Sequence, residues 1–396
     1  MNILIVAEFI KTPSENGNSR FTYLADKLGK DNKVELITTS FSHGLKRQRE
    51  FQGKIKTNYK LTIIKEPGYK KNVSLRRFYS HYIFSKNVKK YLTSLDNKPD
   101  VIYCSIPSLD VAKEVTKFAK KNQIRLIVDI QDLWPEAFKM VFNLPLISDF
   151  IYWPMKMKAE YVYKNADNII AVSETYLNRA LKVNQKSNKN MVTFLGTELN
   201  KFDSYKKEKT EENEKTKVVF IGTLGHSYNI KIIIDALDIL YKKGVNDIEF
   251  IIMGTGPLEN EFKEYAESKD VKCKFLGMLP YSKMVQELCS CDIAVNPINN
   301  GSAGSIINKV GDYAAAGLPV INTQESEEYR NIVEQYNIGF NCKNDNENDI
   351  AEKIEILYKD KELRKRLGKN NRMLAEEKFD RDKTYKDIIN LIKLEN

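Results

Sequence analysis

Short apolar runs rich in Val, Ile and Leu alternate with longer stretches whose apolar residues recur every three to four positions. The short runs predict buried β-strands, and the longer stretches predict amphipathic α-helices. Strands that alternate with helices form parallel sheets covered by helices on both faces, an α/β architecture. In the first half the expected strands are Ile3–Val6, Val34–Thr38, Leu61–Ile64, Val101–Cys104, Leu126–Ile130, Ile169–Val172 and Val192–Leu195, and the expected helices lie near 18–29, 74–94, 108–121, 148–165 and 174–182.

A second series of the same kind follows a charged stretch with almost no large apolar side chains, which is typical of a linker. A chain of 396 residues is also long enough for two cores. The expected strands are Val218–Ile221, Glu249–Met253, Lys274–Leu276, Ile293–Val295, Val320–Asn322 and Gly339–Asn341, and the expected helices lie near 230–243, 257–268, 281–289, 306–316, 326–335, 348–358, 361–377 and 381–394. We predict a first domain at 1–200, a linker at 201–217, a second domain at 218–377 and a closing helix at 378–396. A ligand cleft is expected between the domains, at the carboxyl ends of the strands.

Charge is unevenly distributed. Residues 1–195 contain 33 Lys and Arg against 18 Asp and Glu, a net charge of +15, whereas the remainder carries −5. Residues 43–91 alone hold 14 basic and 2 acidic side chains, with Phe and Tyr among them. A basic surface with interleaved aromatic rings is typical of binding to anionic lipid headgroups or nucleic acid. The alternative is a solvated Lys-rich face. The α/β pattern favours an anionic membrane surface over nucleic acid as the partner.

The sequence offers no membrane span, secretion signal or metal cluster. Its apolar runs fall short of the roughly 18–20 residues that a span requires. The opening MNILIVAEF lacks a basic region and a cleavage site, so it is interpreted as a buried strand that ends before Glu8. Cys289 and Cys291 do not have zinc-ligand spacing, and the chain has only three histidines. We expect a cytoplasmic protein with reduced thiols and no metal or other cofactor.

Glycine-containing turns follow several expected strands of the second domain. Gly222 and Thr223 follow one strand and Gly254 follows the next. Glycine lets backbone N–H groups approach a phosphate closely. Each turn alone is a weak signal, because any strand-to-helix turn can contain glycine, and the stretch at Gly254 lacks the third glycine of a dinucleotide-binding motif.

The stretch GSIINKVGDYAAAGLPV, from Gly304 to Val320, carries a stronger signal. Gly304 and Ser305 precede an expected helix, and a small-residue loop at a helix N-terminus favours anions. Lys309 lies one turn into this helix and would reach a diphosphate, while Asp312 on the same face would accept hydrogen bonds from ribose hydroxyls. The alternative is an ordinary surface ion pair between Lys309 and Asp312. Gly317 is expected to end the helix.

This stretch resembles the donor motif of retaining glycosyltransferase family 4, which has the GT-B fold, in the branch that builds bacterial capsules and O-antigens. The family has two glutamates separated by seven intervening residues. The second, which binds ribose, falls on Asp312, and the first falls on Gly304 and is absent. The resemblance extends along the chain to the loop around Gly17, Asp132-Leu133-Trp134-Pro135-Glu136, Ala166–Ser173, Phe194–Phe202 and the final helix from Phe379.

Candidate catalytic residues lie in the first domain. Asp132 and Glu136 follow the strand Leu126–Ile130, where a carboxylate would orient or deprotonate an acceptor hydroxyl. The alternative is that Asp132 caps the next helix, with Trp134 in the core instead of against a sugar. His43 matches a position that holds a histidine near the acceptor in this branch. His81 is expected on the surface or in packing.

The resemblance implies two Rossmann-like domains, with a nucleotide sugar, UDP-linked, bound by the second and an acceptor bound by the first. It implies transfer with retention, without a metal, of an N-acetylated hexosamine or a deoxyhexosamine. The acceptor would be a polyprenyl-diphosphate-linked sugar or a glycan at the inner face of the membrane. Alternatives are a sugar-nucleotide 2-epimerase of the same fold and a basic nucleic-acid-binding protein.

Overall fold

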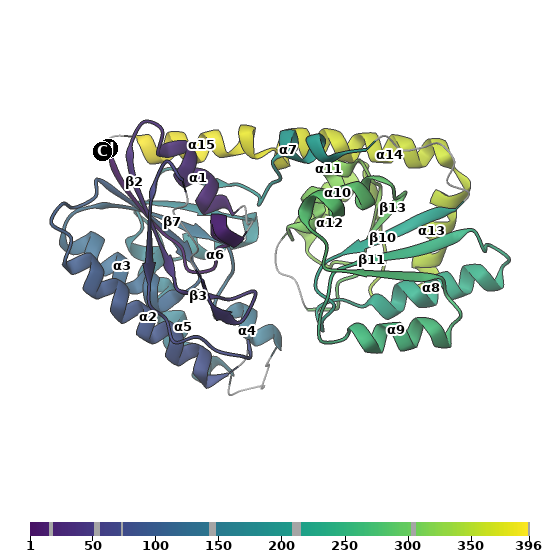
Figure 1. Ribbon diagram of the computed structural model, residues 1–396, viewed down its shortest axis with the longest axis horizontal. Helices are drawn as coiled ribbons and strands as arrows, with labels where there is room; N and C mark the ends of the chain where they lie inside the picture. Colours follow the sequence, from purple (N-terminus) through teal and green to yellow (C-terminus); the bar gives the residue numbers. More distant parts are fainter. Residues whose placement is uncertain are drawn as a thin grey trace. The chain divides into compact units, whose positions relative to one another are not determined.

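The computed structural model describes residues 1–15, 19–50, 56–72, 74–141, 148–207, 215–301 and 306–394. The chain divides into two compact units (Figure 1). The first comprises Met1–Thr193 together with Tyr385–Asn396, and the second comprises Phe194–Thr384. Each unit is built around one parallel sheet, so the α/β prediction is confirmed.

The sheet of the first unit has seven parallel strands in the order β5-β2-β1-β6-β7-β8-β9. Its central strands are buried along almost their whole length, which explains their continuous apolar runs. A switch point lies between β1 and β6, because the chain moves outward in both directions from this pair. The strands are β1 (Asn2–Val6), β2 (Lys33–Thr39), β5 (Lys60–Ile64), β6 (Val101–Ile106), β7 (Arg125–Ile130), β8 (Asn168–Ala171) and β9 (Asn190–Val192).

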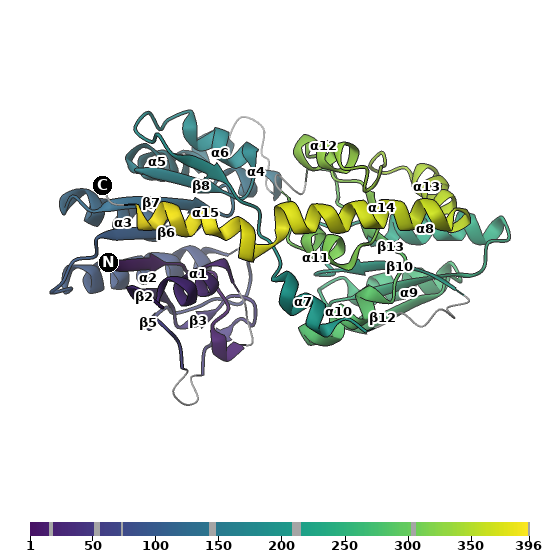
Figure 2. The ribbon, with the colours of Figure 1, turned by 90° about the horizontal axis from the view of Figure 1, so that it is seen from above.

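Helices cover both faces of this sheet. One face packs against α1 (Arg20–Leu28) and the last helix, α15 (Arg381–Lys393), which lie over the strands in Figure 2. The opposite face carries α2 (Leu75–Thr93), α3 (Leu109–Lys121) and α5 (Ser148–Asn165). The remaining elements are η1 (Pro13–Glu15), the hairpin of β3 (Phe41–Ser42) and β4 (Arg47–Gln48), α4 (Glu136–Val141) and α6 (Glu174–Leu181).

A buried polar network joins α1, β7 and α15. The Arg20 guanidinium donates to both carboxylate oxygens of Asp129 at 3.1 Å, and both side chains are inaccessible to solvent. Arg20 also donates to the Tyr385 hydroxyl at 3.2 Å, and the Tyr103 hydroxyl donates to Asp129. A buried carboxylate is tolerated when paired and hydrogen-bonded in this way. The network therefore fixes the end of the chain to the first unit.

The second unit repeats this architecture with the strand order β12-β11-β10-β13-β14-β15, and its switch point lies between β10 and β13. One face packs against α8, α9 and α13, and the other against α7, α10, α11 and α12. The strands are β10 (Thr216–Ile221), β11 (Ile248–Met253), β12 (Cys273–Gly277), β13 (Ile293–Asn296), β14 (Val320–Asn322) and β15 (Gly339–Asn341). The helices are α7 (Leu199–Tyr205), α8 (Ile230–Lys242), α9 (Glu259–Ser268), α10 (Tyr281–Cys289), α11 (Lys309–Ala316), α12 (Glu327–Gln335), α13 (Glu347–Lys359), α14 (Lys361–Leu374) and the π-helical turn η2 (Ala375–Phe379).

The structure differs from the prediction at the expected linker, 201–217. Helix α7 occupies its start, and β10 begins at Thr216. Phe202 is fully buried and packs in the core of the second unit, so an apolar contact holds this charged stretch in place. The second unit accordingly begins at Phe194 instead of at 218. Residues 208–214 of the predicted linker lie outside the described residues.

Candidate functional site

The carboxyl edge of the second sheet brings three predicted donor segments together at the switch point. The turn at Gly222 follows β10, the stretch 297–301 follows β13, and α11 begins at Lys309. The buried Tyr313 hydroxyl accepts a hydrogen bond from Ile221 N at 3.0 Å and donates to Val295 O at 3.1 Å. One residue of α11 therefore fixes the ends of both switch-point strands, where ligands bind in open α/β sheets.

Lys309 occupies an aromatic cage at this edge. Its Nζ lies 3.9 Å from the ring centroid of Phe220 and 3.6 Å from that of Tyr228. The side chain is 8% exposed, and Nζ has no hydrogen-bond partner among the described residues. Burial lowers the pKa of Lys309 well below its usual value. The amine pairs with no carboxylate in the part of the chain that the structure describes, and Asp312 has other partners, so the alternative of a surface ion pair with Asp312 is wrong.

Gly222 and Gly254, in the turns after β10 and β11, have backbone conformations and close neighbours that favour glycine. Gly222 has a φ of +147°, and a Cβ atom there would lie 3.2 Å from Lys309 Nζ. Gly254 has a φ of +142°, and its Cβ would lie 1.8 Å from the carbonyl oxygen of Gly222. Gly254 therefore lets β10 and β11 end close together, a packing role that accounts for the glycine without a ligand. Thr223 follows Gly222 and is exposed.

Asp312 lies in the first turn of α11 and has partners within the second unit. Its Oδ1 accepts hydrogen bonds from the Tyr281 hydroxyl at 2.9 Å and from Thr197 Oγ1 at 3.1 Å. Burial raises the pKa of the carboxyl, and these two hydroxyls oppose that effect. Tyr281 was not predicted as a site residue, because it lies on α10, 31 residues from Asp312.

An asparagine ladder, also missed, crosses the same edge. Each of β13, β14 and β15 ends in Asn, and the three residues are in register. Asn296 donates to Asn322 at 2.9 Å, and Asn322 donates to Asn341 at 2.9 Å. The recurring terminal Asn was the available signal in the sequence. Such paired amides hold the strand ends in place beneath the loops. The predicted donor residues Gly17, Gly304 and Ser305 lie outside the described residues.

In the first unit the Asp132 carboxylate accepts hydrogen bonds and the Glu136 carboxylate forms an ion pair. Asp132 accepts from Leu133 N at 2.9 Å and from Trp134 Nε1 at 3.2 Å, and burial raises its pKa. Glu136 begins α4 and pairs with Arg179 at 2.6 Å. Trp134 is 5% exposed and stacks on His81, so its side chain packs in the core as the structural alternative predicted.

The rings of His43 and His81 both lie near the Tyr69 ring, with centroid distances of 5.8 and 5.6 Å. His43 Nδ1 hydrogen-bonds the Tyr69 hydroxyl, and burial together with Lys46 and Arg77 lowers the pKa of His43 to about 3. His43 is therefore neutral near pH 7. His81 lies on α2 and is only 2% exposed, so the packing alternative is confirmed and the surface alternative is wrong.

A basic cavity of about 550 Å³ opens in the first unit beside the start of α2. Its lining includes five cationic side chains and no carboxylate. The cations are Lys46, Arg47, Lys70, Lys71 and Arg76. Ser74, the N-cap residue of α2, also lines it, so the helix N-terminus adds to the positive potential. The cavity is suited to a phosphate or diphosphate group.

Comparisons with known proteins agree with this geometry. Residues 201–373 match the family model described as glycosyl transferases group 1. The chain is 27% identical over 57% of its length to an uncharacterized glycosyltransferase of Methanocaldococcus jannaschii, of which it covers 60%. It is 23% identical over 74% of its length to the capsular polysaccharide biosynthesis glycosyltransferase CapM of Staphylococcus aureus, of which it covers 76%. It is 24% identical over 75% of its length to a Campylobacter jejuni N-acetylgalactosaminyltransferase named for a diphosphate-undecaprenol-linked substrate, of which it covers 84%.

The fold resembles solved glycosyltransferase structures. The crystal structure of Anabaena HepE with UDP and glucose superposes with a TM-score of 0.69 at 15% identity, over 99% of both chains. Two Rossmann-like parallel sheets of this kind define the GT-B fold. The family model that matches the second unit describes glycosyltransferases, and the named relatives are glycosyltransferases, although the chain spans only 60% of the length of the Methanocaldococcus jannaschii relative.

Proposed function

We propose that the protein transfers a sugar from a UDP-sugar, with retention of configuration as in family 4, to an acceptor used in cell-surface polysaccharide synthesis. The observation that carries this proposal is Lys309, a buried amine with no anionic partner at the switch point of the family-matched unit. A buried cation is unfavourable unless it is paired, and the diphosphate of a nucleotide sugar supplies the missing charge.

The proposed donor-site residues would bind different parts of the nucleotide sugar. Lys309 and the backbone around Gly222, Thr223, Gly304 and Ser305 would bind the diphosphate. The same groups would stabilise the charge that develops on the departing nucleotide, so transfer would need no metal. Asp312, held by Tyr281 and Thr197, would accept hydrogen bonds from the ribose through its remaining oxygen.

The acceptor would bind to the first unit. The basic cavity suits the diphosphate of a polyprenyl-linked sugar, and the name of the Campylobacter jejuni relative supports an acceptor of that class. The CapM relative supports a role in capsule-type synthesis. Asp132 would orient the acceptor hydroxyl through the carboxylate that Trp134 and Leu133 hold. His43, neutral near pH 7, would hydrogen-bond the acceptor.

An apolar and basic face on the first unit would place the enzyme at the inner membrane surface. Helix α2 exposes Leu75, Tyr79 and Tyr82, and α5 exposes Phe150 and Trp153. No helix among the described residues has the length and apolarity to cross a membrane. The exposed rings and neighbouring lysines instead favour contact with anionic headgroups.

Thermal stabilisation and nucleotide release with a panel of UDP-, GDP- and dTDP-sugars would test this function. We expect UDP-sugars to raise the melting temperature, and one of them to release UDP when a polyprenyl-diphosphate-linked sugar is added. Replacing the amine in Lys309→Met should lower transfer by about 10²–10³-fold. Lys361→Met, at an exposed position on α14, is the matched control and should be neutral.

Three outcomes would contradict the proposal. Absence of stabilisation by every nucleotide sugar would exclude the donor site. An isomerised sugar nucleotide without transfer would indicate the epimerase. Salt-sensitive binding of DNA or RNA without any turnover would indicate the nucleic-acid-binding alternative.

A further inference from the structure

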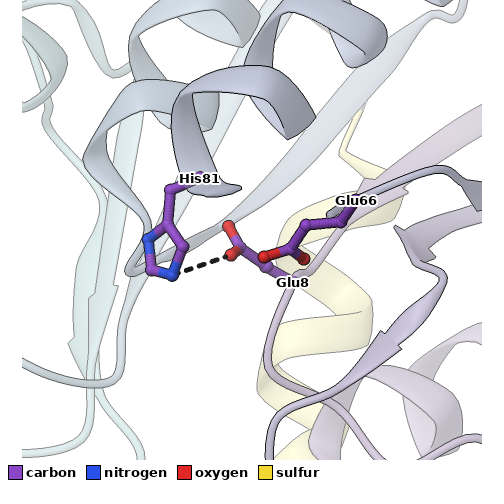
Figure 3. A group of neighbouring side chains, drawn as sticks. All are labelled: Glu8, Glu66 and His81. Atoms are coloured by element: carbon purple, nitrogen blue, oxygen red, sulfur yellow. Dashed lines mark ion pairs between the residues drawn. The ribbon is translucent and has the colours of Figure 1, made fainter. Parts of the chain in front are cut away.

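Three side chains from distant parts of the first unit converge near its switch point (Figure 3). Glu8 lies two residues after β1, Glu66 lies two residues after β5, and His81 projects from α2. One carboxylate oxygen of each glutamate and one ring nitrogen of the histidine all lie within 4.8 Å of one another. Zn–N and Zn–O bonds of about 2.0–2.2 Å place the ligand atoms of a tetrahedral site about 3.3–3.6 Å apart, so the three side chains would move slightly closer together around an ion.

All three side chains are buried, with exposed fractions of 3%, 1% and 2%. Neither oxygen of Glu8 accepts a hydrogen bond from the described residues, although it lies 3.4 Å from His81 Nε2, which also has no hydrogen-bond partner there. Burial and the nearby Glu66 carboxylate raise the pKa of Glu8 well above its usual value, so a bound cation would favour its ionised form. Glu8 is therefore a buried polar group aimed at the other two members of the cluster (Figure 3).

Glu66 is held rigidly beside it. Its Oε1 accepts a hydrogen bond from Ser80 Oγ at 2.6 Å, and its Oε2 accepts one from the Thr39 hydroxyl. A carboxylate has further lone pairs after two such bonds, so it can still bind a cation. Hydrogen bonds that orient a ligand in this way are usual around metal sites.

Within the described ranges of the chain, no Lys or Arg forms an ion pair with either glutamate of the cluster. Arg77 favours the ionised form of both carboxylates, but its guanidinium lies 4.9 Å from the Trp134 ring centroid and donates to Asn72 O at 2.9 Å. Arg49 pairs with Glu15 at 3.0 Å. Burial raises the pKa values of both glutamates. With both carboxylates ionised and the imidazole neutral, the three side chains would carry a charge of −2, which one dication would balance.

We propose that Glu8, Glu66 and His81 form a binding site for a divalent transition-metal ion, with Zn²⁺ as the favoured occupant. An imidazole ligand favours Zn²⁺ and similar ions over Mg²⁺ or Ca²⁺, which prefer oxygen-only sites. The ion would connect β1, β5 and α2 beside the residues that carry the basic cavity. Its role is to position this part of the first unit, and donor binding, which is assigned to the second unit, does not depend on it.

Metal retention by the full-length protein tests the site without any transfer assay. The protein is stripped with EDTA, incubated with Zn²⁺, freed of excess ion and analysed by mass spectrometry. We expect roughly one Zn²⁺ per chain and a higher melting temperature than that of the stripped protein. Glu8→Gln and His81→Asn should each lower the affinity by more than the roughly 10–100-fold typical of an outer-shell partner.

Glu35→Gln is the matched control, because it removes a half-buried glutamate of the same sheet that bonds Thr62 instead of the cluster. It should retain the ion. Circular dichroism of each stripped variant confirms folding, and Co²⁺ spectra distinguish a nitrogen and oxygen site from a thiolate site. Two results would overturn the proposal: no retained ion in the unmodified protein, which would leave a shared proton to neutralise the carboxylates, or retention that survives in both cluster variants.

Discussion

At the scale of single residues, Lys309 is the most informative side chain of the second unit. Its amine lies against Phe220 and Tyr228, and cation–π contacts with these rings favour the ammonium form. Burial opposes that form and lowers the pKa of Lys309 well below its usual value. A bound diphosphate would shift the balance back toward the ammonium, because an adjacent anion raises the pKa of an amine. Donor binding should therefore be coupled to protonation.

We predict that UDP binding takes up close to one proton per molecule at pH values between the lowered pKa of free Lys309 and its higher pKa in the complex. UDP affinity should accordingly fall as the pH rises from the free-state pKa to the pKa in the complex. Calorimetry in buffers of different ionisation enthalpy measures this uptake. Lys309→Met should bind UDP without it, and Lys361→Met should retain it. Equal uptake by all three proteins would show that another group is protonated.

At the scale of elements, the turns after β10 and β11 determine how closely the two strand ends approach. Gly254 has the positive φ of +142° and lies against the carbonyl of Gly222. Gly225, three residues beyond Gly222, has no atom closer than 3.9 Å to the position of an added Cβ. Glycine is therefore required at position 254 by the backbone conformation and the close contact, whereas position 225 could hold a larger residue.

We predict that Gly254→Ala destabilises the second unit by about 1–3 kcal/mol from backbone strain alone, with a further penalty from the clash. Gly225→Ala should change the free energy of unfolding by less than about 0.5 kcal/mol. Urea denaturation of both variants measures the difference. If the two substitutions proved equally mild, the contact between the turns would not contribute to stability.

At the scale of the whole molecule, charge and exposed apolar residues are concentrated in the first unit. Residues 1–195 carry a net charge of +15, whereas the rest of the chain carries −5. Phe150 is 83% exposed and Trp153 is 59% exposed, both on α5. Rings of this exposure near basic residues are suited to the headgroup region of an anionic bilayer.

We predict that the double substitution Phe150→Ser with Trp153→Ser weakens sedimentation with anionic liposomes at least tenfold, because these rings would otherwise bury apolar area in the bilayer. Turnover of a water-soluble acceptor should be unaffected. Met278→Ser provides the control, because Met278 is 75% exposed but belongs to the second unit. Unchanged liposome binding by the double variant would exclude this face as the membrane contact.

Local patterns of apolar and polar residues were sufficient to predict most of the helices and strands. The expected strand Gly339–Asn341 and helix 281–289 are found with those bounds, and Gly317 ends α11 with a φ of +70°. These features depend on residues close in sequence, whose periodicity and end signals are visible directly. The linker prediction failed at Phe202 because local patterns do not show tertiary contacts. The burial of one aromatic ring in a charged segment depends on the core against which it packs.

The order of residues along the chain is sufficient to predict two parallel α/β series, the glycine turns of the second series and the positions of Lys309 and Asp312. The surroundings of these side chains follow from tertiary contacts, which form the aromatic cage of Lys309, the hydrogen bond from Tyr281 to Asp312, and the cluster of Glu8, Glu66 and His81. The physical reason is strand order. Periodicity predicts a strand but not its neighbours, and β1, β2 and β5 lie side by side only because the sheet assembles in that order.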